Sequence, residues 1–223
     1  IHERDELVGT SFARDESLVG VALRFDNREL FRDVRGVGWG SYFDLIGESN
    51  DVLDSDYDGD IWQTRFAHQF DLPGRIGLGY EVVAGFAERT AEPFFLGSDS
   101  GEEGQLFGRN KYRLRGYDSG VQQGHYIYRQ TVSFGFPLAR IDNNWNLNPL
   151  GLMDISANVF AESGKAWFRR QNRDTLTSIG AEITTELVLG YRLLLPVKVG
   201  YAHGLDEANG RTSQSYVSIG LFF

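Results

Sequence analysis

The chain has 223 residues, and its 31 acidic side chains outnumber its 22 basic ones to give a formal net charge of −9. This balance argues against nucleic acid as a partner, because phosphate contacts need clustered cations. The absence of cysteine excludes disulfides, thiolate metal sites and cysteine nucleophiles. No run approaches the roughly 20 apolar residues of a membrane-spanning helix, so only strands are left as a route through a membrane.

Apolar side chains recur at every second position in nine segments, and this period predicts β-strands. Strands of about ten residues match the length that a tilted strand needs to cross a bilayer, and they exceed the average strand of a soluble sandwich. The predicted strands cover residues 18–26, 37–45, 62–72, 76–86, 128–136, 155–162, 179–189, 195–202 and 216–223.

Charged side chains of these segments fall on the face opposite the apolar row. They are Arg24, Asp26, Arg65, Glu81, Arg129, Glu162, Glu182, Glu186 and Lys198. Unpaired charge is costly in a dry core but is accommodated by a water-filled lumen. The sequence therefore predicts an all-β fold, an antiparallel transmembrane β-barrel with one face toward lipid and the other toward water.

The connections alternate in length, as they do in outer-membrane barrels. We expect the long ones, 47–59, 88–124, 168–175 and 206–213, to be external, and the shorter ones, 27–35, 72–74 and 190–192, to be periplasmic. The 139–150 connection departs from this pattern, and we interpret it as an ordered long turn on the periplasmic side.

Nine strands cannot close a bacterial single-chain barrel, which has an even number of strands and no open edge in lipid. The first residues, IHERDELVG, read as a loop and lack the basic start and apolar core of a signal peptide. We therefore interpret the chain as the C-terminal part of a larger barrel. The missing N-terminal strands would lie upstream or in a partner chain.

Two stretches are more specific than the strand period: RLRGYDSG at 113–120 and NVFAESGKAWF at 158–168, followed by the terminal YVSIGLFF. Together they resemble the C-terminal barrel of the BamA/TamA superfamily of outer-membrane assembly and translocation proteins. The resemblance implies a sixteen-stranded barrel in the bacterial outer membrane, of which this chain holds about nine C-terminal strands. It also implies that the long external loop of residues 89–124 folds back into the lumen.

The resemblance assigns the lumen-loop motif to Arg115, Gly116 and Tyr117, and the acidic partner of the arginine to Glu162. A second acidic position of the family falls on Ser133, which is a departure from the family pattern. A guanidinium can bind a carboxylate in bidentate fashion, so one such pair can hold a long loop inside a wet channel. The alternative is that Arg115 lies in a solvated loop and Glu162 balances Arg129 or Lys198.

The C-terminal residues Tyr216, Gly220, Leu221 and Phe223 resemble the signal that the assembly machinery reads on client barrels. They are also consistent with an ordinary last strand. In the family, the seam between the first and last strands is weakly paired and can open sideways, which exposes an edge for a client strand.

Asp54, Asp56 and Asp58 have the spacing of the first half of a calcium-binding loop, but position twelve is Arg65 instead of glutamate. A solvated acidic loop is the favoured interpretation, and we expect no metal and no cofactor. No Ser/His/Asp set, GxSxG or HExxH motif appears, so the sequence does not indicate an enzyme.

The functional hypothesis is a barrel of the BamA/TamA type that takes part in insertion or translocation of proteins through a lateral seam and a loop-plugged lumen. Its expected partners are outer-membrane lipid, lipopolysaccharide and client outer-membrane proteins. The alternative is a barrel that serves as a membrane anchor, secretion pore or passive channel for an N-terminal periplasmic domain.

Overall fold

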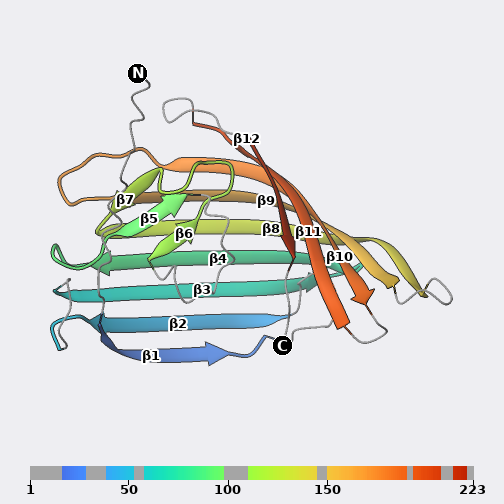
Figure 1. The fold of residues 1–223 in the computed structure, drawn as a ribbon, viewed down its shortest axis with the longest axis horizontal. Helices are drawn as coiled ribbons and strands as arrows, with labels where there is room; N and C mark the ends of the chain where they lie inside the picture. The colour runs from blue at the N-terminus through green and yellow to red at the C-terminus, as the bar shows by residue number, and fades with distance from the viewer. Residues whose placement is uncertain are drawn as a thin grey trace, which may run out of the picture.

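A computed structural model of the chain describes residues 17–28, 39–52, 58–97, 110–144, 150–189, 193–206 and 213–219. Nine strands form one antiparallel sheet in the order β1-β2-β3-β4-β8-β9-β10-β11-β12 (Figure 1). They are β1 (Val19–Asp26), β2 (Gly40–Ser49), β3 (Asp60–Leu72), β4 (Ile76–Ala87), β8 (Tyr126–Asn144), β9 (Leu150–Trp167), β10 (Leu176–Leu189), β11 (Leu193–Gly204) and β12 (Ser213–Ile219). Across these ranges no segment is a helix that is long and apolar enough to span a membrane.

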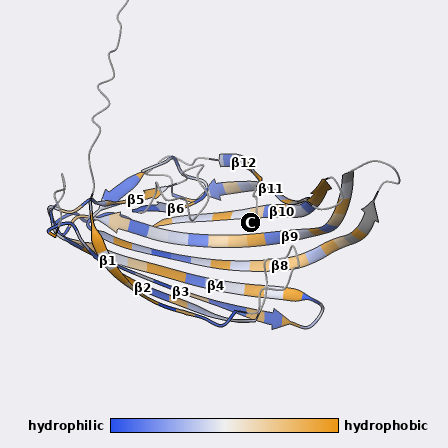
Figure 2. Cartoon of the chain, turned by 60° about the horizontal axis from the view of Figure 1, so that its bottom comes forward, coloured by the Kyte–Doolittle hydropathy of each residue, from blue (hydrophilic) through white to orange (hydrophobic). Residues whose placement is uncertain are grey.

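Three short strands in the long connection between β4 and β8 form a second sheet. β5 (Phe94–Gly97) lies between β6 (Lys111–Arg113), which is parallel to it, and β7 (Gln122–Gly124), which is antiparallel. The large sheet curves like a trough, and the small sheet lies inside it toward one end (Figure 2). The described part of the long connection therefore lies over one end of the concave face.

The two faces of the large sheet differ in polarity. Its convex face exposes rows of large apolar side chains, such as Val21 at 79% and Val217 at 66% exposure. Its concave face buries polar and charged side chains, namely Asp44, Gln63, Arg129, Ser156, Glu162, Ser178 and Glu182. Among the described residues, no second layer covers the apolar rows.

All nine predicted strands are present, and the all-β antiparallel class is confirmed. The sheet is not closed: β1 is paired only with β2, and β12 only with β11, within the described ranges. The number of strands in a complete barrel and its place in a membrane remain proposals.

The prediction that residues 139–150 form a long turn was wrong for residues 139–144, which continue β8; residues 145–149 lie outside the described ranges. β8 continues to Asn144 and pairs with β9 as far as Gly151, with register shifts at Pro137/Ala139 and Arg140/Asn143. These irregularities interrupt the period of two, so the alternation that identifies strands elsewhere is lost here. The strands of the small sheet were also missed, since three or four residues are too few to show a period.

An apolar cluster holds the small sheet on the wall. Phe94, Leu96 and Leu114 of the long connection pack against Ile127 and Leu176 of the large sheet, and all five are essentially buried. Gly85 of β4 leaves the space for this contact, because a Cβ there would lie 2.8 Å from the Phe94 ring.

Gly124 of β7 tests this docking. A Cβ at this position would lie within 2.3 Å of the Trp167 backbone, which cannot move aside as a flexible side chain can. We expect Gly124→Ala to destabilise the docked connection by about 1–3 kcal/mol, a typical cost of overpacking. Limited proteolysis should show faster cleavage within the 88–125 connection. The neighbouring Gln123→Ala, at an exposed position, is the control, and equal cleavage of both variants would contradict the docking.

Candidate functional site

Arg115 projects from the long connection onto the concave wall and is bound there by two carboxylates. Its Nε and Nη2 donate to Glu162 Oε1 at 2.9 and 2.5 Å, and its backbone N–H donates to Glu162 Oε2 at 2.8 Å. Its Nη1 donates to Glu182 Oε1 at 2.6 Å. We call Arg115, Glu162 and Glu182 the arginine clamp.

The strand alternation places both carboxylates of the clamp on the same face. Glu162 of β9 and Glu182 of β10 lie on the concave side of adjacent strands, together with Phe160. The guanidinium of Arg115 lies 3.3 Å from the centroid of the Phe160 ring. The cation is thus held by hydrogen bonds at its edge and by an aromatic ring at its face.

The clamp is nearly closed to solvent, and its net charge of one negative unit is balanced by the neighbouring Lys198. The side chains of Glu162 and Glu182 are each 2% exposed, and Lys198 Nζ lies 3.6 Å from Glu182 Oε2. Burial alone would lower the pKa of Arg115, but the charge and hydrogen bonds of Glu162, together with the charge of Glu182, raise it above its ordinary value. Arg115 therefore stays charged at any physiological pH.

The next two residues fasten the connection to the end of the wall. Gly116 has a φ of 87°, and a Cβ there would lie 2.8 Å from the backbone N of Gly204, so only glycine fits. Tyr117 is 2% exposed, and its hydroxyl lies 2.5 Å from the Thr177 carbonyl oxygen and 3.0 Å from Asp206 Oδ2. Burial raises the pKa of the Tyr117 hydroxyl, which keeps it a neutral donor.

Tyr216 joins the last strand to the clamp. Glu182, Gly200 and Tyr216 lie side by side in register on β10, β11 and β12. The Tyr216 ring reaches across Gly200, where a Cβ would lie 2.3 Å from it, and its hydroxyl donates to Glu182 Oε1 at 2.5 Å. Arg113 of the long connection lies over the same ring, 4.6 Å from its centroid. The edge strand and the loop therefore share one carboxylate.

A second group of contacts holds the other side of the connection. The Tyr112 hydroxyl donates to Gln63 Oε1 at 2.5 Å, and Gln63 Nε2 donates to Asn110 Oδ1 at 3.1 Å. Arg129 donates to the Arg113 carbonyl at 2.8 Å and forms an ion pair with Glu81. The connection is thus bound from β3 and β8 as well as from β9 and β10.

A polar cavity of about 420 Å³ lies beside the clamp. Arg65, Arg113, Arg129 and Lys198 are among the cations that line it, and Ser133 lies on its wall. Among the residues that line this cavity, positive side chains outnumber negative ones.

The structure brings together the predicted pair, Arg115 and Glu162, and adds a second carboxylate that sequence reasoning had not assigned to the arginine. The hydrogen bonds that Arg115 donates to described side chains go to Glu162 and Glu182, whereas Ser133 only lines the cavity. The signal that could have found Glu182 is its place on the inward register of the strand after Glu162.

Several predicted positions lie outside the described residues: Asp54, Asp56, Gly220, Leu221 and Phe223. Asp58 is described and exposed. Among the residues that the structure describes, no cluster of three or more His, Cys, Asp or Glu side chains could hold a metal ion.

Neither a protein-family model nor a curated protein matches this chain. The functional interpretation therefore depends on the geometry of the clamp, the polarity of the two faces and the resemblance of the two sequence stretches.

The clamp can be tested by breaking and reversing it. We expect Arg115→Ala to weaken docking of the connection by about 3–5 kcal/mol, because two buried carboxylates lose their partner. Limited proteolysis of the 88–125 connection is the readout. The double variant with Arg115→Glu and Glu162→Arg should regain only part of the protection from proteolysis, since the backbone N–H of residue 115 loses its carboxylate acceptor. Full protection of the Arg115→Ala variant would contradict the clamp.

Tyr216→Phe tests the link between edge strand and clamp. The variant keeps the ring over Gly200 but loses the hydrogen bond to a charged acceptor, which costs about 1.5–3 kcal/mol. In a double-mutant cycle with Glu182→Gln, we expect the two effects to be clearly non-additive. Tyr128→Phe, whose hydroxyl donates to Gln130 in an exposed pair, is the matched control. Additive effects in the cycle would show that Tyr216 and Glu182 act independently.

Proposed function

We propose that this chain is the C-terminal wall of a bacterial outer-membrane barrel of the BamA/TamA type, which takes part in protein insertion or translocation and is not an enzyme. The observation that carries the proposal is the arginine clamp, which holds a long loop against the polar concave face. The motif that supplies Arg115, Gly116 and Tyr117 is also the motif on which the family resemblance depends.

The convex face supports a position in lipid. Its exposed apolar rows include Phe66, Val132 and Ile183, and it carries a row of aromatic rings at one end of the sheet. In that row, the ring centroids of Phe86 and Tyr126 lie 5.3 Å apart, and those of Tyr126 and Trp167 lie 5.5 Å apart. Aromatic rings gather at the level of the lipid headgroups in membrane proteins.

The two edges of the sheet support an incomplete barrel. In lipid, unpaired backbone groups are costly, so β1 and β12 need either further strands of the same protein or a partner chain. On this proposal about seven strands complete a sixteen-stranded wall around the loop. The cavity beside the clamp then becomes part of a narrow, plugged lumen.

The mechanism that follows uses the edge strand β12. If its pairing to the first strand is weak, opening of the seam exposes backbone donors and acceptors that can template a client strand. Tyr216 ties β12 to Glu182, and Glu182 also binds Arg115. Movement of the edge strand is thereby coupled to the loop that fills the lumen.

A single pair of substitutions tests the membrane position. Ile183 and Thr184 are neighbours on β10, with Ile183 on the convex face and 52% exposed. We expect Ile183→Arg to lower insertion into liposomes by about 2–4 kcal/mol, the cost of arginine on the lipid face of a barrel. Thr184→Arg faces the wet side and should insert nearly normally. Heat-modifiable migration on gels measures the folded fraction, and equal insertion of both variants would contradict a lipid-facing wall.

The activity itself is tested in liposomes that contain the protein and an unfolded client barrel. An assembly factor should raise the folding rate of the client, and Arg115→Ala should remove this effect. A protein that inserts correctly but leaves the client rate unchanged would favour the alternative of an anchor, secretion pore or passive channel. Conductance in planar bilayers then separates an anchor from an open pore.

A further inference from the structure

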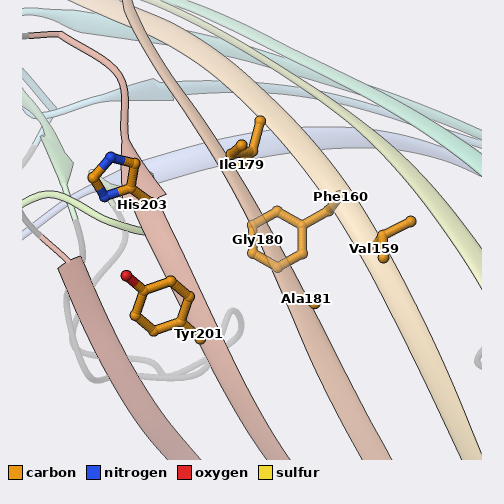
Figure 3. A pocket seen from close by; sticks show the side chains of 7 residues that line it. All are labelled: Val159, Phe160, Ile179, Gly180, Ala181, Tyr201 and His203. Carbon is orange, nitrogen blue, oxygen red and sulfur yellow. The ribbon is translucent and has the colours of Figure 1, made fainter.

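A groove of about 590 Å³ crosses the convex face over β9, β10 and β11 (Figure 3). Its lining residues are Val159, Phe160, Ile179, Gly180, Ala181, Tyr201 and His203. The groove opens to the outside of the wall, and it is separate from the arginine clamp and the polar cavity of the concave side.

The groove exists because small side chains alternate with large ones in two neighbouring rows. In one row Ala181 pairs with Val159 and Tyr201, and in the next row Ile179 pairs with Ala161 and His203. Ala181 therefore leaves a low floor between higher walls. Behind the floor, the Phe160 ring fills the inner side of Gly180, where a Cβ would lie 2.2 Å from it. The floor is backed by a packed ring and cannot collapse inward.

One end of the groove is polar, whereas the rest is apolar. Ser213 Oγ lies 2.9 Å from His203 Nδ1 and 3.0 Å from the Tyr201 hydroxyl. These three side chains come from the end of β11 and the start of β12. The groove is thus amphipathic along its length, as a site for a molecule with a polar head and an apolar tail would be.

A positive charge lies on the same face toward the end of β9. Lys165 follows Ala161 by four residues, so it points to the convex side as well, and its Nζ lies 5.4 Å from the Trp167 ring. In a chain with a net charge of −9, a cation beside an aromatic ring at this level favours an anionic headgroup.

We propose that this groove binds one acyl chain of a phosphorylated, multiply acylated lipid, the lipid A part of lipopolysaccharide. The chain lies along Ala181 between Val159 and Tyr201, and the polar head is directed to His203, Ser213 and Lys165. This inference rests on the proposed function, because only a wall in the outer membrane meets such a lipid. It goes further by assigning a specific site to one lipid among those that surround the barrel.

The experiment measures lipid retention by native mass spectrometry of the protein released from detergent micelles, with purified lipid A as the probe. A neutral phosphatidylcholine with chains of the same length is the comparison lipid. We expect one retained lipid A per protein and an excess over the neutral lipid of about tenfold. The excess is modest because, in a bilayer, only packing and polar contacts separate a site from bulk hydrocarbon.

Ala181→Leu fills the floor and should reduce lipid A retention by about tenfold. Ala84→Leu, the same change on the convex face of β4, is the matched control and should retain lipid A normally. Lys165→Gln should abolish the preference for lipid A over the neutral lipid without weakening binding of the acyl chain in the groove. Equal retention by the Ala181→Leu and Ala84→Leu variants would overturn the site, and equal retention of the two lipids by the unaltered protein would overturn the choice of lipid A.

Insertion into liposomes separates this proposal from the proposed function. If the barrel proposal is wrong, neither the unaltered protein nor any variant inserts as a heat-modifiable species. If only the groove proposal is wrong, all variants insert equally well, and Ala181→Leu has no effect on lipid retention.

Discussion

The structure depends on one buried cation shared by two carboxylates. Arg115 reaches the wall from a long connection, and its binding to Glu162 and Glu182 fixes the middle of that connection on the concave face. Taking these charges out of water costs several kcal/mol per ion, and it is compensated only where geometry and hydrogen bonding are complete. Both carboxylates meet this condition: Glu162 also accepts from the Arg115 backbone, and Glu182 also accepts from Tyr216.

Three glycines of the large sheet have no Cβ where an aromatic ring of the neighbouring strand lies. Gly180 faces Phe160, Gly200 faces Tyr216 and Gly47 faces Trp62, each pair in register. In all three, a Cβ on the glycine would lie less than 3 Å from the ring. An aromatic ring over a cross-strand glycine covers backbone that would otherwise be bare and fixes the register. The abundance of glycine in this sequence therefore serves packing within the wall as well as turns.

The strands and their faces were predictable because alternation is a property of single residues along the chain. The convex position of Phe66 and the concave position of Glu81 follow from the period alone. The 139–144 segment was not predictable, since two register shifts remove the period. The small sheet was hidden for another reason: Phe94 and Leu96 acquire their role only from contact with Ile127 and Leu176, which are distant in sequence.

The candidate site divides in the same way. The pairing of Arg115 with Glu162 came from a motif resemblance, but the contribution of Glu182 requires knowing that β9 and β10 bring two inward carboxylates together. The contact of Tyr216 with Glu182 was harder to predict, because it runs from β12 to β10 and depends on Gly200 of the strand between them. Sequence patterns can predict which residues are neighbours along a strand or across one hairpin. They cannot predict a contact that crosses an intervening strand.

Strand β10 contributes both to the arginine clamp on the concave face and to the groove on the convex face. Its even-numbered Glu182 points to the loop and carries the clamp, while its odd-numbered Ile179 and Ala181 form the groove on the opposite face. Gly180 lies between them with the Phe160 ring against its inner side, and that same ring lies under the Arg115 guanidinium. Only one strand and one aromatic ring separate the charged clamp from the apolar groove. A single layer of strands can present polar side chains on one face and apolar side chains on the other, because successive residues of a strand point to opposite faces.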